Sequence, residues 1–301
     1  MKILLTGGKG FVGSHIRESL GSRYEIIAPS QDELDVTDSA RVDEAFRNGR
    51  FDAVIHGAIE GGPLVAETTL RGYWNIARHA HRVDRILYFG SGAEYGKHRD
   101  LVKVGEESIG EAVPRDPYGF AKLLCNQFCR ASDNITNLRL FGIFGPYEGY
   151  AVKFISNAVA KTIAGLPLVI RQNVIFDYLW VEDLMRMLPR FLEGERLFAD
   201  VNVTPTSSIS LAEIAELVLR ELQRPADFTI ETPGLNFQYT GDNARLLQYC
   251  PSFEFTPVAE GVRRLTAFYR ERSATIDREL LAGDAYRHAL ATRAAEKGTG
   301  K

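Results

Sequence analysis

Two side chains that could move a proton lie four residues apart near the middle of the chain. They are Tyr118 and Lys122, and the segment 118–130 that contains them has a helical pattern. Residues four apart share one face of a helix. A nearby ammonium group favours the phenolate and lowers the pKa of a tyrosine, which suits it to proton transfer near neutral pH. A solvated lysine beside a half-buried tyrosine would show the same spacing, so the pair needs a second observation.

Ser91 provides that second observation. It follows the apolar segment 85–90, which reads as a buried strand, at the point where a polar side chain would face a cleft. Its hydroxyl could hold a substrate carbonyl while Tyr118 transfers the proton. The alternative interpretation is an ordinary turn serine between Gly90 and Gly92.

A glycine-rich turn near the N-terminus is typical of a dinucleotide site. Gly7, Gly10 and Gly13 lie between the apolar strand 2–5 and the helical segment 14–20. Glycines there permit a tight turn, and the helix N-terminus offers free N–H groups to a pyrophosphate. The whole turn is therefore expected to bind cofactor: Gly7, Lys9, Gly10, Phe11, Val12 and Gly13.

Strands and helices must position these residues, and the first half of the chain predicts a regular alternation of the two. The expected strands are 2–5, 24–29, 53–56, 85–90, 136–141, 166–170 and 201–203, and the expected helices are 14–20, 39–47, 64–82, 118–130, 152–164, 181–191, 211–222 and 257–269. Such alternation predicts an α/β fold, a Rossmann-type doubly wound parallel sheet, with a smaller mixed α/β C-terminal substrate lobe.

The predicted boundaries follow from where this alternation loosens, near Gly145. Residues 1–165 together with about 174–200 form the expected dinucleotide-binding domain. About 145–173 and 201–272 form the expected substrate lobe. Residues 273–301 read as a helical, partly frayed tail.

Composition limits the possible partners. The chain has 301 residues, a net charge of −3, and 36 basic against 39 acidic side chains without a long basic run, which argues against nucleic acid. No apolar stretch approaches a membrane span and no signal-peptide pattern precedes the first strand, so a soluble cytoplasmic protein is expected. The cysteines Cys125, Cys129 and Cys250 have no metal-ligand spacing, so no metal is expected.

In this order and at this spacing, the glycine turn, Ser91 and the Tyr118/Lys122 pair closely resemble the extended short-chain dehydrogenase/reductases that act on nucleotide sugars. The resemblance covers roughly residues 1–270. Further segments match the family: Asp35-Val36 at the adenine position, Val54–Ala58 with Gly57 and Ala58 lining the cofactor, Ser91–Gly96, Leu138–Pro146 with Gly142 near the substrate, and Phe176–Leu184. The resemblance implies catalysis by Ser91, Tyr118 and Lys122, with Tyr118 and Lys122 also touching the cofactor.

Departures from the family pattern narrow the expected reaction. Gly92 and Ala93 stand where sugar dehydratases carry an acidic pair and where fucose-type epimerase-reductases carry a cysteine at the second position, so elimination and epimerisation lack an obvious base. Gly92 and Ala93 are expected to line the substrate. Phe176 replaces the arginine that binds the substrate phosphates in the family. Arg171 or Arg245 could take over that role, or either could be a surface charge.

Cofactor choice depends on the end of the second strand. Pro29, Ser30 and Gln31 stand where NAD-preferring members carry an acid for the ribose hydroxyls, and Lys9 could reach a 2′-phosphate. NADP(H) is therefore favoured, and NAD(H) remains possible.

Three functions follow from the resemblance. The first is an NADP(H)-dependent ketoreductase of a nucleotide-linked 4-keto-6-deoxy sugar, with hydride to C4 and Tyr118 as proton donor. The second is an NAD-dependent nucleotide-sugar 4-epimerase, and the third is a non-catalytic cofactor-binding regulator.

A homodimer is also expected, because family members commonly pair through the helices that correspond to 64–82 and 118–130. Cys125, Cys129, Leu124 and Phe128 would lie near that surface if they do not face their own sheet.

Overall fold

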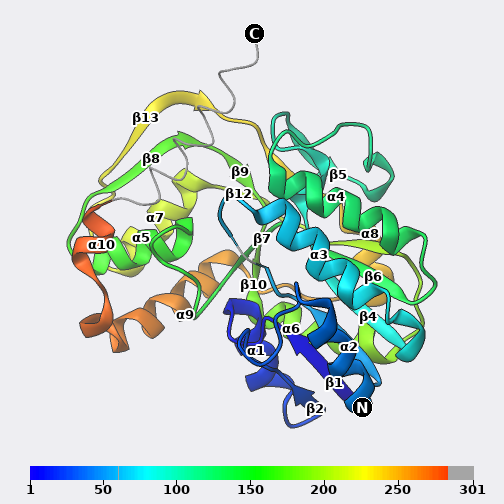
Figure 1. Cartoon of the computed structure of the whole chain (residues 1–301). Helices are drawn as coiled ribbons and strands as arrows, with labels where there is room; N and C mark the ends of the chain where they lie inside the picture. The colour runs from blue at the N-terminus through cyan, green and yellow to red at the C-terminus, as the bar shows by residue number, and fades with distance from the viewer. Residues whose placement is uncertain (60, 284–301) are drawn as a thin grey trace.

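A six-stranded parallel sheet forms the centre of the protein, as a computed structural model shows (Figure 1). The structure describes residues 1–59 and 61–283. In chain order the elements are β1 (Lys2–Thr6), α1 (Phe11–Leu20), β2 (Glu25–Ile27), α2 (Ser39–Asn48), β3 (Ala53–His56), α3 (Val65–Ala77), η1 (Ala80–Arg82), β4 (Arg85–Ser91), η2 (Gly92–Tyr95), β5 (Leu101–Val104), η3 (Glu106–Ser108), α4 (Pro117–Arg130), β6 (Ile135–Leu140), β7 (Gly142–Phe144), α5 (Phe154–Ile163), β8 (Leu168–Asn173), β9 (Ile175–Phe176), β10 (Tyr178–Trp180), α6 (Val181–Glu193), β11 (Asp200–Val203), β12 (Ile209–Ser210), α7 (Leu211–Glu221), β13 (Phe228–Leu235), β14 (Tyr239–Gly241), α8 (Ala244–Tyr249), α9 (Val258–Glu271), η4 (Ser273–Thr275) and α10 (Arg278–Ala282).

The order of the strands reverses at one point of this sheet. The sheet runs β11-β6-β4-β3-β1-β2, and every neighbouring pair is parallel. The chain goes from β1 outward to β2 and then returns to the other side of β1 for β3. Ligands of open α/β sheets bind at the carboxyl ends of the strands where the order reverses in this way. The predicted Rossmann-type α/β fold is confirmed, and β1 and β3 mark its ligand-binding edge.

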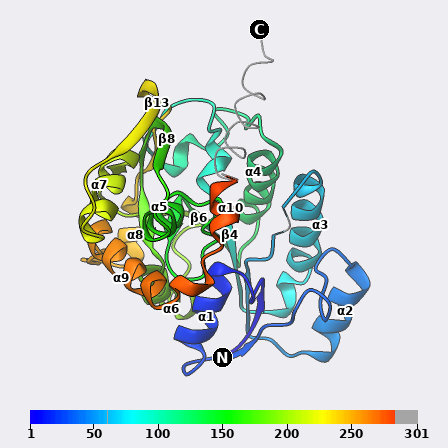
Figure 2. The ribbon, with the colours of Figure 1, turned by 90° about the vertical axis from the view of Figure 1, so that its left-hand side faces the viewer.

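Helices cover both faces of the sheet, since its strands are nearly continuous apolar runs that must be buried on both sides. One face packs against α1 and α6, in a core that includes Ile16, Leu184 and Leu188. The other face packs against α2, α3 and α4, in a core that includes Val42, Ile76 and Cys125. Figure 2 shows α3 on the same side of the molecule as α2 and α4.

The second lobe has its own core beside the sheet (Figure 1). Helices α5, α7 and α9 pack together there, with Val159, Ile214 and Leu265 fully buried. Strands β8 and β13 form a parallel pair at the surface of this lobe. Helix α7 begins as the sequence predicts, because Ser210 and Glu213 form a reciprocal capping box at its N-terminus.

Three elements show how the predicted domain boundaries relate to the two cores. Strand β11 belongs to the large sheet and not to the substrate lobe, since it pairs with β6. Helix α5 lies in the second lobe, within the predicted lobe segment 145–173, because Ile155 and Val159 pack in that core. Helix α8 returns to the first core through Leu246 and Tyr249. The predicted helix 64–82 ends at Ala77, and most of the predicted 273–301 tail lies outside the described residues.

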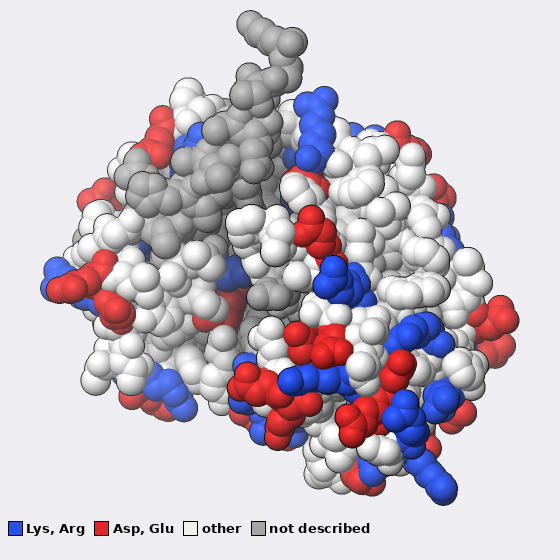
Figure 3. Space-filling view, in the orientation of Figure 1, with Lys and Arg blue, Asp and Glu red and all other residues white. Residues whose placement is uncertain are grey.

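Two further observations concern the surface. No helix of the described chain is long and apolar enough to cross a membrane. On the face drawn in Figure 3, acidic and basic side chains intermingle over the N-terminal part of the molecule, without a continuous patch of one sign among its described residues.

Candidate active site

The glycine turn after β1 leaves room for a ligand because side chains could not occupy it. Gly7 has a φ of +78°, and a Cβ there would lie 2.8 Å from the backbone nitrogen of Ala58. A Cβ on Gly13 would lie 2.2 Å from the carbonyl oxygen of Gly7, so α1 begins directly against the turn. This cradle, formed by Gly7, Gly13 and the Gly57-Ala58 segment, fits the pyrophosphate of a dinucleotide, whose charge the N-terminus of α1 would stabilise.

Hydrogen bonds fix the ends of β1 and β3 beside that cradle. The Thr6 hydroxyl lies 2.7 Å from Nδ1 of His56, and the backbone N–H of Ala58 donates to the same hydroxyl oxygen at 3.3 Å. Both side chains are buried. The two strand ends therefore form one rigid platform at the point where the strand order reverses.

Ser91 ends β4 on the same edge of the sheet, and the turn that follows holds it in place. Its backbone N–H donates to Oε1 of Glu94 at 2.9 Å, and its hydroxyl oxygen accepts the backbone N–H of Ala93 at 3.2 Å. Glu94 is fully buried and also accepts from Asn137 and Arg139. Because the Ser91 oxygen accepts a backbone bond, its proton remains available to donate to a substrate oxygen.

Helix α4 carries Tyr118 and Lys122 to this turn. The carboxylate of Asp116 caps the helix by accepting the backbone N–H of Gly119 at 2.8 Å, and Pro117 occupies the first turn. A Cβ on Gly119 would lie 2.7 Å from the carbonyl oxygen of Ala93. The glycine after Tyr118 thus lets the helix approach the turn that follows Ser91.

Lys122 lies deep below Tyr118 and is only 4% exposed. Its Nζ donates to the carbonyl oxygen of Phe89 at 2.7 Å and lies 5.8 Å from the ring centroid of Tyr118. Burial lowers the pKa of Lys122 to about 8. The same buried environment, together with the charge of Lys122, lowers the pKa of His56 to about 3, so His56 is neutral.

An aromatic wall faces Ser91 from segments that lie far along the chain. Tyr239 packs between Phe141 and Phe176, with ring centroids 5.1 Å from each. Tyr178 stacks on Phe176 at 5.5 Å. A Cβ on Gly92 would lie 2.5 Å from the Tyr239 hydroxyl and 2.8 Å from Phe141, so the small residue beside Ser91 makes room for this wall.

The adenosine side of the site includes a carboxylate that the sequence did not predict to be there. Glu33 accepts both the backbone N–H and the hydroxyl of Ser30, at 2.7 and 2.9 Å. These hydrogen bonds lower the pKa of Glu33, and the charge of Lys9 contributes to the shift. Asp35 accepts the N–H and hydroxyl of Thr37, which leaves the loop before α2 in a defined turn.

The two arginines proposed for the substrate phosphates lie in different settings. The guanidinium of Arg245 donates to Asp200 at 2.9 Å and lies 3.6 Å from Glu106. Arg245 is therefore part of an ion-pair network at the edge of β11. Arg171 lies on β8 of the second lobe and is partly exposed.

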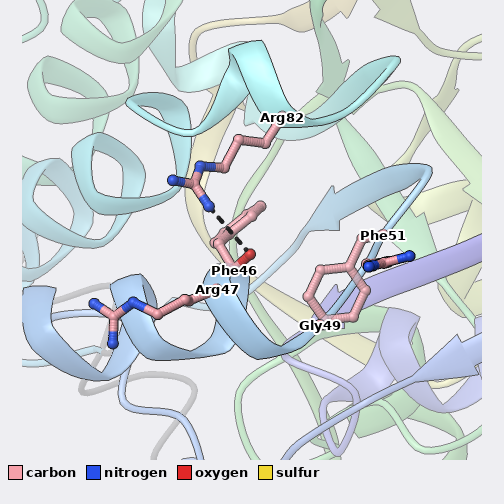
Figure 4. A pocket seen from close by; sticks show the side chains of 6 residues that line it. Phe46, Arg47, Gly49, Phe51 and Arg82 are labelled. Atoms are coloured by element: carbon pink, nitrogen blue, oxygen red, sulfur yellow. Dashed lines mark hydrogen bonds between the residues drawn. The ribbon is translucent and has the colours of Figure 1, made fainter.

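Another pocket of the described chain lies far from this chemistry (Figure 4). It is lined by Phe46, Arg47, Gly49, Arg50, Phe51 and Arg82. Phe51 and Arg82 precede β3 and β4, which places the pocket at the opposite, amino edge of the sheet. Arg82 donates to the backbone oxygen of Phe46 at 3.4 Å, and the guanidinium groups of Arg47 and Arg82 lie apart.

Two features of the site were not predicted from the sequence. The bond between Glu94 and Ser91 could have been found, because Ser-x-x-Glu is the spacing of a capping box. The contact of Tyr239 with Gly92 had no local signal, since the two residues meet only through the fold.

Comparisons with known proteins show what this chain is similar to. A family model described as the NAD dependent epimerase/dehydratase family matches residues 3–203. The GDP-L-fucose synthase of Escherichia coli (strain K12) is 28% identical over 169 residues, which are 50% of this chain and 53% of that protein. The chain thus spans about half the length of that relative in the alignment.

Solved structures match over most of the chain. The UDP-glucose 4-epimerase of Thermotoga maritima, solved with UDP-glucose, has a TM-score of 0.79 at 19% identity and covers 90% of this chain and 99% of its own. A GDP-L-fucose synthetase from Naegleria fowleri bound to NADP has a TM-score of 0.79 at 18% identity and covers 91% and 94%. The predicted resemblance is therefore confirmed: the chain belongs to the NAD dependent epimerase/dehydratase family, and it is an NAD(P)-dependent enzyme of the extended short-chain dehydrogenase/reductase type.

Proposed function

We propose that this enzyme is an NADP(H)-dependent ketoreductase of a nucleotide-linked 4-keto-6-deoxy sugar. The reduced nicotinamide supplies a hydride when it is bound. The residues of the chain supply the rest: Ser91 donates a hydrogen bond to the C4 keto oxygen, and Tyr118 gives that oxygen a proton. Lys122 binds the nicotinamide ribose, and its charge favours the phenolate that Tyr118 becomes.

One observation supports reduction over elimination. Glu94 is the carboxylate nearest to Ser91 along the turn, yet it is fully buried and accepts hydrogen bonds from Ser91, Asn137 and Arg139. A carboxylate held in this way is not available as an acid or base at the sugar. Gly92 and Ala93 add no ionisable group. The site therefore offers a proton donor at the carbonyl, which is what ketone reduction requires.

Cofactor preference would depend on the glycine turn after β1 and on the loop after β2. Lys9 and Ser30 would hold the 2′-phosphate of NADP(H), and Gly7, Gly10, Phe11, Val12 and Gly13 the pyrophosphate. Asp35, Val36, Gly57 and Ala58 would line the adenosine and the adjoining edge of the sheet. For the substrate, Ser91, Gly92, Ala93, Tyr118 and Gly142 would surround the sugar, and Arg171 or Arg245 would meet the phosphates.

Glu33 favours a second candidate, an NAD-dependent nucleotide-sugar 4-epimerase. Its carboxylate accepts from Ser30 and lies near enough to Lys9 to feel its charge. A carboxylate in the loop after β2 could accept from the ribose hydroxyls of NAD, and it would repel a 2′-phosphate. Epimerisation would use the same Ser91, Tyr118 and Lys122.

The first experiment separates the two reactions. Purified protein is denatured and any released dinucleotide is identified, while undenatured protein is titrated with NADPH and NADH. An empty site that binds NADPH reversibly, with loss of NADPH absorbance when a nucleotide-linked 4-keto-6-deoxy sugar is added, supports the ketoreductase. Stoichiometric NAD retained through purification, with interconversion of UDP-sugar epimers, supports the epimerase.

Tyr118→Phe tests whether the protein is catalytic at all. We expect kcat to fall by roughly 10²–10⁴-fold, since the proton donor is lost. Binding of NADPH should persist, because the glycine cradle is unchanged. A variant that keeps every measured activity would instead favour a non-catalytic regulator.

A further inference from the structure

The hydroxyl of Tyr239 is buried without a hydrogen-bond partner in the part of the chain that the structure describes. The residue as a whole is 5% exposed. Leaving a buried hydroxyl without a partner destabilises a protein, so native proteins rarely retain one unless something else satisfies it. The position of the Tyr239 hydroxyl indicates which ligand atom could accept its hydrogen bond.

Neighbouring side chains prevent this hydroxyl from turning elsewhere. Phe141 and Phe176 hold the ring from two sides at 5.1 Å, and Nζ of Lys97 lies 4.8 Å from its centroid. The backbone of Tyr239 is tied to two strands, because β14 pairs with both β5 and β9. The direction of the hydroxyl is therefore set before any ligand arrives.

That direction is toward the reacting groups. The hydroxyl lies directly over Gly92, since a Cβ there would come within 2.5 Å of it. Burial raises the pKa of Tyr239 most, a hydrogen-bond interaction with the Ser91 side chain opposes that rise, and the charge of Tyr118 adds to it. Tyr239 thus lies beside Ser91, which would hold the keto oxygen, and near Tyr118, which would protonate it.

We propose that Tyr239 is a third substrate-contacting hydroxyl of this site, donating a hydrogen bond to the keto oxygen that Ser91 also holds. This inference rests on the proposed function, in that it places a carbonyl oxygen between Ser91 and Tyr118. The substrate would satisfy the hydroxyl that the free protein leaves without a partner.

The hydroxyls of Ser91, Tyr118 and Tyr239 would have different chemical roles. Burial raises the pKa of Tyr239 well above its ordinary value, so the group stays neutral and keeps its proton. A neutral phenol that keeps its proton acts as a fixed donor that stabilises negative charge as it grows on the oxygen. Tyr118, beside the ammonium of Lys122, is the group placed to give its proton away.

Tyr239→Phe tests the inference, and Tyr24→Phe is the matched control. Tyr24→Phe likewise removes a hydroxyl from a buried ring, but that hydroxyl donates to Oε1 of Glu193 at 2.6 Å. Tyr24 directly precedes β2 and so lies at the amino edge of the sheet, whereas Ser91 ends β4 at the carboxyl edge. We expect Tyr239→Phe to lower kcat/KM for the sugar about 10–100-fold without changing NADPH affinity. Tyr24→Phe should leave kcat/KM unchanged.

The midpoint of thermal unfolding without ligand gives the second readout. Tyr239→Phe should unfold at or above the wild-type temperature, because it removes a buried donor without a partner, whereas Tyr24→Phe should unfold lower. A lowered midpoint for Tyr239→Phe, or unchanged kcat/KM in an active enzyme, overturns the inference. If wild-type protein turns over neither keto sugars nor UDP-sugar epimers, the proposed function fails, and the unfolding comparison alone decides the role of Tyr239.

Discussion

The Lys122 ammonium that the proposed reaction uses is buried, and burying its charge lowers the stability of the folded protein. Burial lowers its pKa from 10.5 to about 8, so in the folded protein the charge is costly at pH 7. The unfolded chain binds this proton more readily, and between pH 8 and 10.5 it holds more protons than the folded chain. Stability contributed by this residue therefore rises with pH across that window, by a total on the order of 3 kcal/mol.

Lys122→Met makes this linkage measurable. We expect the free energy of unfolding of wild type, relative to the variant, to increase as pH rises from 8 to 10. In the same range kcat/KM for NADPH should fall in wild type, because it reports the free enzyme and Lys122 loses its charge. Denaturant unfolding at several pH values and initial rates check both. If the free energy of unfolding depended on pH in the same way in the two proteins, the lowered pKa would not belong to Lys122.

At the scale of the element, helix α4 depends on its cap to place Tyr118 and Lys122. Asp116 is the N-cap and accepts the N–H of Gly119 at 2.8 Å. Asp116→Ala should cost about 1 kcal/mol of stability. It should also lower kcat, since the first turn that carries Tyr118 would fray.

Ser210→Ala, which removes the N-cap of another helix, is the matched control for Asp116→Ala. Ser210 caps α7 in the second lobe and accepts the N–H of Glu213 at 3.2 Å. We expect a similar loss of stability with little loss of kcat, measured by urea unfolding and steady-state rates. If both variants lose kcat equally, the cap of α4 has no special role in placing Tyr118.

Local patterns in the sequence were enough to predict most of the helices and strands of the first domain. The glycine turn, the strand that ends at Ser91 and the helix of Tyr118 and Lys122 each carry their own periodicity, and the structure brings them to one edge of the sheet. The short strands β5, β9 and β14 were not predicted. They contain two to four residues, and β14 is stabilised by pairing with strands far along the chain, which no local pattern encodes.

Contacts between distant parts of the chain also explain what could not be predicted in the second half of the sequence. The segment 201–203 was correctly predicted as a strand but assigned to the wrong lobe, because only its pairing with β6 shows where it belongs. The ion-pair partners of Arg245, Asp200 and Glu106, come from different parts of the chain, and no local pattern predicted them. Residue types and spacing predict an element and its chemistry, whereas the partner of a charged side chain depends on the tertiary fold.

At the scale of the whole molecule, the outer surface of α3 and α4 is the expected dimer contact. The two helices lie side by side (Figure 1). Cys125 and Cys129 are fully buried toward the sheet, so they do not form this surface. Trp74 and Phe128 do: they are 53% and 52% exposed, with ring centroids 5.8 Å apart. Exposed aromatic pairs of this kind mark protein–protein contacts.

Phe128→Glu should therefore convert a dimer into a monomer, because a charge would be buried without a partner at the contact. Sedimentation velocity at several protein concentrations measures the change. Leu235→Glu is the control: Leu235 is 60% exposed on β13 of the other lobe, and its replacement should leave the association state unchanged. A wild-type protein that sediments as a monomer at every concentration would rule out this dimer. Equal dissociation by both variants would show that another surface carries the contact.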